Sequence, residues 1–288
     1  MGKASRKYDP SKPQKIKRAP IPFVARPFEG LAFENQLVAL RDFVPSGYVK
    51  VTTKPEYGSR ELLLVSYLPE GTPGIMRADG VPMVAVRTTA NSRDLSHDLG
   101  AAAVAVLKLE DGSALSGFDV RDPGPRLDEV VDTESFEFHM SPNFDFWVEP
   151  AKLEDEDVKS ALDHTAEETI PTEIVPGTES AFWCRMNHDF VRWIRNEPEN
   201  RVLDALARLK VRGEAHLGED TRFIGAFRTC GLIVPVFEMA ERTAAADLAD
   251  AAAQLEKKLV AEIDNRDELT DDERRARAGL VSRQVSLR

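Results

Sequence analysis

Short runs of apolar, strand-forming residues recur along the chain, separated by polar or glycine-containing turns. They predict strands at residues 49–52, 62–68, 144–148 and 181–186. Runs of this length, rich in β-branched and aromatic residues, favour strands over buried helices. Short strands therefore account for part of each half of the chain.

Apolar residues at helical spacing mark three longer segments. Ser92 is placed to cap the first helix, Asn200 to cap the second, which would stop at Gly213, and Thr243 to cap the third. Their apolar faces are Leu95, Leu99, Ala102 and Val106; Val202, Leu203, Leu206 and Leu209; and Leu248, Ala252, Leu255, Leu259 and Ile263. Each face is suited to cover a sheet.

Residues 74–107 and 225–259 share a pattern. Each segment has a Gly, an Arg three residues later and a second Gly three after that, followed by an apolar strand, a polar turn and an Ala-rich helix. Gly80 and Gly231 are expected in hairpin turns, since glycine adopts positive φ without steric cost. The pattern reflects either an internal duplication or a chance similarity of two common hairpin-plus-helix units.

The order of these elements predicts an α+β protein rather than a doubly wound fold, because strands and helices do not alternate regularly. We expect two similar small lobes of antiparallel hairpins covered by helices, preceded by a disordered basic arm. The expected divisions are a basic flexible arm (1–26), a first α+β lobe (27–109), an acidic connector with strands (110–150), a second α+β lobe (151–264) and an Arg-rich C-terminal helix and tail (265–288).

Charge is distributed unevenly along the chain. The total is −11, yet residues 1–26 hold eight bases against one acid and are therefore at +7. Residues 110–180 hold four bases and twenty acids, a net −16. The bases of the arm are Lys3, Arg6, Lys7, Lys12, Lys15, Lys17, Arg18 and Arg26. Because prolines also punctuate this arm, it should stay disordered until a polyanion or an acidic surface holds it.

The C-terminal segment predicts one more helix. Thr270 and Glu273 fit a capping box, with two acids between them in the first turn. The helix would either dock Leu280 and Val281 on the second lobe or present a basic surface to RNA or a partner. The arginines of that surface would be Arg274, Arg275, Arg277 and Arg283.

No catalytic or cofactor motif is recognisable. The histidines lack metal-ligand spacing, and neither GxxxxGK[ST] nor GxGxxG occurs. Cys184 and Cys230 lie in strand-forming runs, as expected of buried, reduced thiols. Aromatic residues at 136–147, with Trp183 and Trp193, could stack on unpaired bases, although such residues more often form a core. We expect no cofactor, metal or catalytic residue.

No apolar stretch approaches the roughly 20 residues of a membrane helix, and no apolar segment of a signal peptide follows the basic start. The hydrophobic content, 42%, is ordinary for a globular protein. We therefore expect a cytoplasmic protein.

Several stretches resemble one protein family: RPFEGL at 26–31, LVALRDFVPS at 37–46, FDFW at 144–147, GEDTRFIGAFRTCGLIVPV at 218–236 and ERRARAGLVSRQVSLR at 273–288. The family is an uncharacterised actinobacterial one of unknown function, and the similarity covers nearly all of the chain beyond the arm. Some members are labelled as related to the preprotein translocase ATPase SecA, through a short Cys-rich zinc module. This chain lacks that cysteine cluster and an ATPase loop, so the resemblance implies no catalytic residue.

Three hypotheses about function follow. The first is a non-enzymatic cytoplasmic factor that binds structured RNA or the ribosome through the arm and the Arg-rich end. The second is a protein-interaction adaptor linked to protein export or a chaperone-like role, and the third is an enzyme with an unrecognised site. The arm could also be only a solubilising tail. Removing residues 1–26 distinguishes these hypotheses, since RNA binding would be lost under the first alone.

Overall fold

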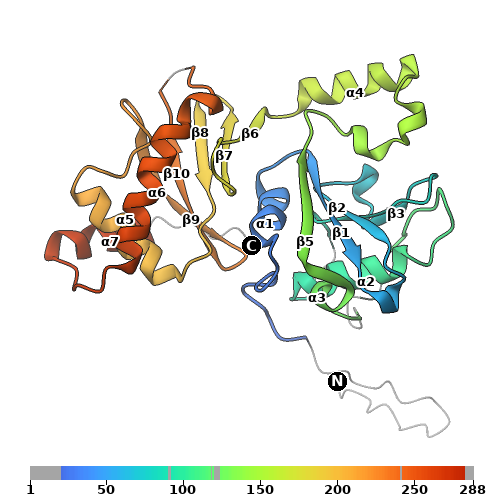
Figure 1. Ribbon diagram of the computed structural model, residues 1–288, viewed down its shortest axis with the longest axis horizontal. Helices are drawn as coiled ribbons and strands as arrows, with labels where there is room; N and C mark the ends of the chain where they lie inside the picture. Colours follow the sequence, from blue (N-terminus) through green and yellow to red (C-terminus); the bar gives the residue numbers. More distant parts are fainter. Residues whose placement is uncertain (1–20, 90–91, 118, 120–123, 241, 283–288) are drawn as a thin grey trace, which may run out of the picture.

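The computed structural model describes residues 21–89, 92–117, 119, 124–240 and 242–282. Its strands form two five-stranded sheets, one in each lobe (Figure 1). The first sheet contains β1 (Gly47–Thr53), β2 (Glu61–Val65), β3 (Gly74–Met76), β4 (Pro82–Ala85) and β5 (Val131–Met140). The second contains β6 (Thr172–Ile174), β7 (Ala181–Arg185), β8 (Asp189–Trp193), β9 (Arg222–Thr229) and β10 (Leu232–Glu238).

Helices surround and separate these sheets. The α-helices of the described residues are α1 (Glu34–Asp42), α2 (Leu95–Val106), α3 (Leu127–Val130), α4 (Glu156–Glu168), α5 (Glu199–Val211), α6 (Ala249–Asp264) and α7 (Asp271–Ser282). The short 3₁₀ helices are η1 (Pro55–Tyr57), η2 (Pro69–Gly71), η3 (Asp145–Trp147), η4 (Pro150–Lys152) and η5 (Ala245–Leu248). The fold class is α+β, as predicted.

The strand order is β3-β4-β2-β1-β5 in the first sheet and β6-β7-β8-β10-β9 in the second. Both predicted hairpins are present, with Gly80 at φ +83° and Gly231 at φ +78° in their turns. However, β4 runs parallel to its inner neighbour β2, whereas β10 runs antiparallel to β8. The two lobes therefore share a local hairpin-plus-helix unit but attach it to the sheet in opposite directions.

Helix α1 lies between the two lobes (Figure 1). Leu37, Val38 and Leu40 of this helix are completely buried. They belong to one apolar cluster that also contains Val49 from the first sheet and Phe182 from the second. The two lobes thus share a core, with α1 at its centre.

The second sheet is buried on both faces. Phe182 and Leu232 point toward α1 and the first lobe, whereas their neighbours Trp183 and Ile233 join the cluster formed with α5 and α6. Because successive side chains of a strand point to opposite faces, the apolar runs of β7 and β10 supply both clusters.

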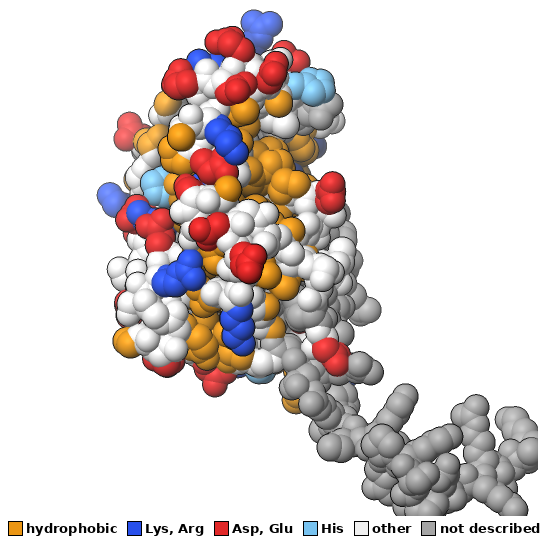
Figure 2. Space-filling model, turned by 90° about the vertical axis from the view of Figure 1, so that its right-hand side faces the viewer, with side chains coloured by type: hydrophobic (Ala, Val, Ile, Leu, Met, Phe, Trp, Pro, Cys, Tyr) orange, Lys and Arg blue, Asp and Glu red, His pale blue; other side chains and the backbone are white. Residues whose placement is uncertain are grey.

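The outer face of the first sheet carries a third, smaller cluster that includes Leu63, Met83 and Phe146. Hydrophobic side chains gather between acidic and basic ones on the side of the molecule shown in Figure 2.

The strand predicted at residues 144–148 is wrong, because this segment forms η3. The Asn143 side chain accepts a hydrogen bond from the Asp145 amide at 3.0 Å, which favours a turn, and the rings of Phe144 and Trp147 then stack at 4.2 Å.

The predicted helix faces are confirmed, but three predicted caps are wrong. Asp94 rather than Ser92 caps α2, α5 begins after Pro198 rather than after Asn200, and η5 precedes α6. Asp94 takes the role because its carboxylate accepts from the amide of Ser96 at 3.0 Å. The pattern gave the buried face correctly, since the face depends on spacing and not on the first residue of the helix.

Helix α7 begins as predicted. The Thr270 amide donates to Glu273 at 2.8 Å, and the Glu273 amide donates to the Thr270 hydroxyl at 3.3 Å, which completes the capping box. Leu280 is buried in the second lobe, whereas Val281 is 43% exposed, so only the first of the two predicted docking residues packs.

Two helical glycines provide a matched test of the packing. A Cβ at Gly100 would lie 2.2 Å from the carbonyl oxygen of Pro125, whereas a Cβ at Gly279 would meet no atom within 4 Å. We expect Gly100→Ala to lower the free energy of unfolding by about 1–3 kcal/mol and Gly279→Ala to raise it by about 0.5–1 kcal/mol. Urea denaturation measures both; equal effects of the two substitutions would contradict the close approach at Gly100.

Candidate functional site

The basic arm joins the folded body through contacts at residues 24–27. The Val24 amide donates to the carbonyl oxygen of Arg93 at 3.0 Å, just before α2. The guanidinium of Arg126 donates to the carbonyl oxygen of Pro27 at 2.8 Å, just before α3. The start of the described chain is therefore tied to two helix N-termini of the first lobe.

Arg26 links this junction to α1 and to the second lobe. Its guanidinium donates two hydrogen bonds of 2.7 Å to the buried carboxylate of Glu34, and a third of 3.2 Å to the carbonyl oxygen of Asn196. The hydrogen bonds to Glu34 raise the pKa of Arg26. The turn at Gly231 also lies here, since a Cβ added to it would come within 2.8 Å of the Arg26 Cβ. Arg26 thus connects α1 to the second lobe through hydrogen bonds.

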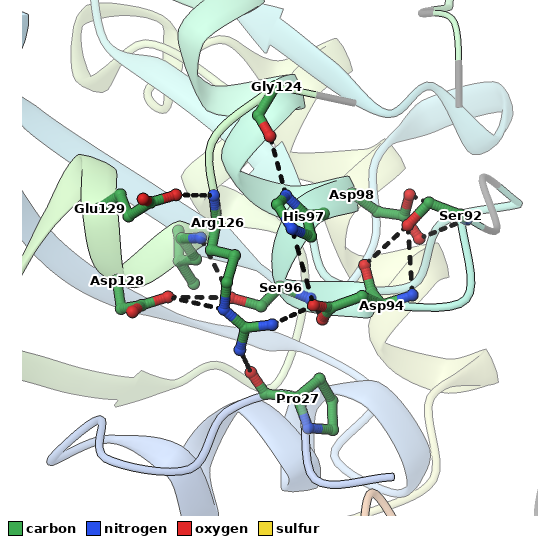
Figure 3. Close-up of polar contacts among 11 residues, drawn as sticks. Pro27, Ser92, Asp94, Ser96, His97, Asp98, Gly124, Arg126, Asp128 and Glu129 are labelled. Carbon is green, nitrogen blue, oxygen red and sulfur yellow. Dashed lines mark hydrogen bonds and ion pairs between the residues drawn. The ribbon is translucent and has the colours of Figure 1, made fainter. Parts of the chain in front are cut away.

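A polar network lies beside this junction, at the start of α2 (Figure 3). Asp94, which is almost fully buried, caps α2 and also pairs with the guanidinium of Arg126. Arg126 contacts Asp128 at 3.2 Å as well as Pro27, so one side chain joins three separate segments. Arginine suits this position because its planar donors can serve several acceptors at once.

Asp98 is the second buried carboxylate of the network. It accepts hydrogen bonds of 3.1 and 3.2 Å from the amide of Ser92, which positions the loop before α2. Burial raises the pKa of Asp98, with Asp94 and His97 as its titratable neighbours. The carboxylate is therefore more easily protonated than a solvent-exposed aspartate.

Serine, histidine and aspartate occur together here, but their contacts are structural. The Ser96 hydroxyl accepts from the Leu127 amide at 3.0 Å, and His97 Nδ1 lies 2.8 Å from the carbonyl oxygen of Gly124. In Figure 3 the contacts of His97 run to Gly124 and Asp94, and none of those drawn runs to a serine. The network holds the loops in place.

Metal ligation, reactive thiols and membrane-spanning helices are the other features that a functional site could use. Among the described residues, no group of three His, Cys, Asp or Glu is arranged to hold a metal ion. Cys184 and Cys230 are free thiols, and burial raises the pKa of Cys230 to about 11, which keeps it protonated at neutral pH. Within the described ranges, no helix combines the length and apolar character that a membrane crossing requires.

An open cavity of about 600 Å³ lies in the second lobe, between the end of α5 and the start of β9. Lys210, His216 and Arg222 line it together with the acids Glu219 and Asp220. Arg222 is also paired with Glu238 at 2.7 Å. The lining is therefore of mixed charge, without a set of groups that converge on one ligand.

The predicted arginines of α7 each contact an acid of the same chain. Arg274 pairs with Asp271 at 2.6 Å, Arg275 pairs with Asp272, and Arg277 pairs with Asp204 at 2.6 Å. Arg277 ties α7 to α5. The other predicted polyanion-binding residues, Lys3, Arg6, Lys7, Lys12, Lys15, Lys17, Arg18 and Arg283, lie outside the described residues.

Arg126 was not among the residues that the sequence pattern predicted to be functional. Its one local signal is the spacing to Glu129, whose carboxylate accepts from the Arg126 amide at 2.7 Å as in a capping box. The contacts to Asp94 and Pro27 join residues far apart in the sequence, and no spacing rule reveals them.

The model of a family of unknown function, DUF5926, matches residues 27–288. The chain belongs to this family. The match begins where Arg126 holds Pro27, so the DUF5926 region includes both lobes and α7 but not the basic arm. Neither a curated protein nor a solved structure matches the chain. The expected resemblance to an uncharacterised family is confirmed, and it assigns no activity.

The pair of Arg126 and Asp94 can be tested with a double-mutant cycle. Arg126→Met leaves the Asp94 carboxylate buried without its partner, and we expect a loss of about 2–4 kcal/mol in the free energy of unfolding. Asp94→Asn can still cap α2, so the double variant should lose less than the sum of the single variants. Additive losses in urea denaturation would show that the two side chains do not interact.

Asp98 predicts a pH dependence of stability. Because its pKa is raised in the folded state, the folded protein binds the proton more tightly than the unfolded chain. The contribution of Asp98 to stability therefore falls as pH rises from the ordinary aspartate pKa through the raised one.

Asp98→Asn should remove this dependence and leave stability at neutral pH unchanged or higher. Asp98→Ala should lower it by about 1–3 kcal/mol, because the Ser92 amide loses its acceptor. Thermal unfolding at several pH values measures both variants. A wild-type protein that gains stability relative to Asp98→Asn as pH rises would contradict the sign.

Proposed function

We propose that this protein is a non-enzymatic cytoplasmic factor that binds structured RNA or the ribosome through its basic arm. The observation that carries the proposal is the concentration of positive charge in the arm. Residues 1–20 contain seven bases and a single acid in a chain whose total charge is −11. Phosphate backbones recognise local positive charge, so the acidic total does not oppose this function.

The pairing of the other arginines supports the choice of the arm. Arg26 and the described arginines of α7 are each within hydrogen-bond distance of a carboxylate of the same chain. A guanidinium already paired with a carboxylate contributes little additional attraction for phosphate. The seven bases of residues 3–18 are therefore the residues to which we assign the binding.

The attachment of the arm also suits this role. Contacts of Val24, Arg26 and Pro27 hold its end against both lobes. A bound RNA would therefore be tethered to the body at this junction. The two lobes would act as a shaped body next to the RNA, without a catalytic contribution.

The test replaces Lys3, Arg6, Lys7, Lys12, Lys15, Lys17 and Arg18 with Gln in the full chain. The binding of a fluorescent RNA hairpin and of purified ribosomes is then measured over a range of salt concentrations. If all seven bases contact phosphates, the wild-type affinity should fall with salt with a logarithmic slope between about −5 and −6, and the slope should approach zero in the variant.

Arg274→Gln with Arg275→Gln is the matched control, since these exposed arginines already pair with acids of their own helix. This double variant should bind RNA as the wild type does. Unchanged RNA and ribosome binding by the seven-residue variant would refute the proposal. A protein partner that persists after nuclease treatment, in the absence of any RNA binding, would favour the adaptor hypothesis instead.

A further inference from the structure

An aromatic surface remains on the first lobe that the proposed RNA binding does not use. It consists of Tyr67, Phe144 and Trp147, which we call the aromatic face. The rings of Phe144 and Trp147 stack at 4.2 Å, and the rings of Tyr67 and Trp147 lie 6.2 Å apart. The Trp147 indole donates to the carbonyl oxygen of Tyr67 at 2.9 Å, which fixes the two segments together.

The aromatic face packs on a buried ring and is partly accessible to solvent. Phe146 is buried under it in the third apolar cluster, edge-on to Trp147 at 6.3 Å. Tyr67 is 38% exposed, and Phe144 and Trp147 are half-buried. Exposed aromatic rings held side by side by buried neighbours are the usual recognition surface for proline-rich segments in the polyproline II conformation.

The basic arm contains a segment of this kind. Residues 10–15 read Pro-Ser-Lys-Pro-Gln-Lys, with two prolines three residues apart and a lysine two residues after the second. A polyproline II helix has three residues per turn, so Pro10 and Pro13 would lie on one edge. That edge can pack on aromatic rings, while Lys15 extends beyond it.

Two acidic residues lie close in sequence to the rings of the aromatic face. Glu70 follows Tyr67 by three residues and is exposed, and Asp145 lies between Phe144 and Phe146 in the sequence. Asp145 accepts a hydrogen bond from the Ser141 hydroxyl at 2.8 Å. Neither carboxylate forms an ion pair with any lysine or arginine of the described ranges. Their charge is complementary to Lys12 and Lys15.

The arm is longer than the strand that it would follow. Strand β5 has ten residues and spans about 34 Å, from α3, where Arg126 holds Pro27, to the loop that leads to Phe144. Pro10 lies fourteen residues before Val24, and fourteen residues span up to about 46 Å when fully extended. The extended segment exceeds the length of β5 by about 12 Å, which is available for the remaining path to the aromatic face.

We propose that residues 10–15 of the arm dock on the aromatic face of the same molecule, with Pro10 and Pro13 on the rings of Tyr67 and Trp147 and with Lys15 beside Glu70. This docking requires no RNA and is independent of the proposed function. It would hold part of the arm on the acidic body until a competing polyanion displaces it.

Trp147 provides a direct readout in the full chain. The other two tryptophans, Trp183 and Trp193, are each only 3% exposed, so acrylamide quenches mainly the fluorescence of Trp147. Pro10→Ala with Pro13→Ala should release the segment and raise the quenching constant about twofold at low salt, if docking covers most of the indole. Pro20→Ala with Pro22→Ala removes two prolines outside the segment and should leave quenching unchanged.

An exchange of charges tests whether Lys15 lies beside Glu70 in the docked segment. Lys15→Glu should raise quenching as the proline variant does, and adding Glu70→Lys should restore the wild-type value. Trp147→Phe confirms the source of the signal, since quenching should then be low in every arm variant.

Equal quenching of the wild type and of the Pro10→Ala, Pro13→Ala variant would overturn the docking. Quenching that depends on protein concentration would overturn docking within one molecule, because it would show an arm bound to a second copy. These measurements contain no RNA, so a failure of RNA binding would not affect them, and a failure of docking would leave the RNA measurements interpretable.

Discussion

The burial of helix α1 against both sheets is the contact on which the arrangement of this protein depends. A nine-residue helix is marginal on its own, so α1 is stabilised mainly by the surfaces that enclose it. The carbonyl oxygens at its C-terminal end also have a partner, because the half-buried guanidinium of Arg87 donates hydrogen bonds of 2.8 Å to those of Leu40 and Val44. Asp42 bonds to Thr229 of the second sheet, so apolar and polar contacts both connect the lobes.

The same helix links the core to the base of the arm. Glu34, in the first turn of α1, holds Arg26, and Arg26 reaches the second lobe. Arg126 adds the first lobe to this junction through Pro27 and the buried carboxylate of Asp94. The last residues of the arm are therefore attached to the most buried part of the molecule. Its charged portion precedes these contacts in the sequence.

The sequence predicted the helices and hairpins whose burial is periodic. The faces of α2, α5 and α6 follow from spacing alone, because one side of each helix faces the core. Helix α1 was missed because its apolar residues form one continuous run, 37–40, and because it also buries the polar residues Glu34 and Gln36, so that no helical period appears. Residues 144–148 were misassigned because aromatic residues suit strands, while the local hydrogen bonds around Asn143 decide the turn. Arg126 was missed because its partners are distant in sequence.

Because the two lobes share a core, neither lobe should fold well when it is produced without the other. Phe182 and Leu232 would be left on an uncovered sheet face if the second lobe were produced without α1. A separated half would expose a large apolar patch and tend to aggregate. Neither lobe is therefore suited to be transferred to another protein without the other during evolution. The DUF5926 match extends across both lobes as one unit, which agrees with their inheritance as a pair.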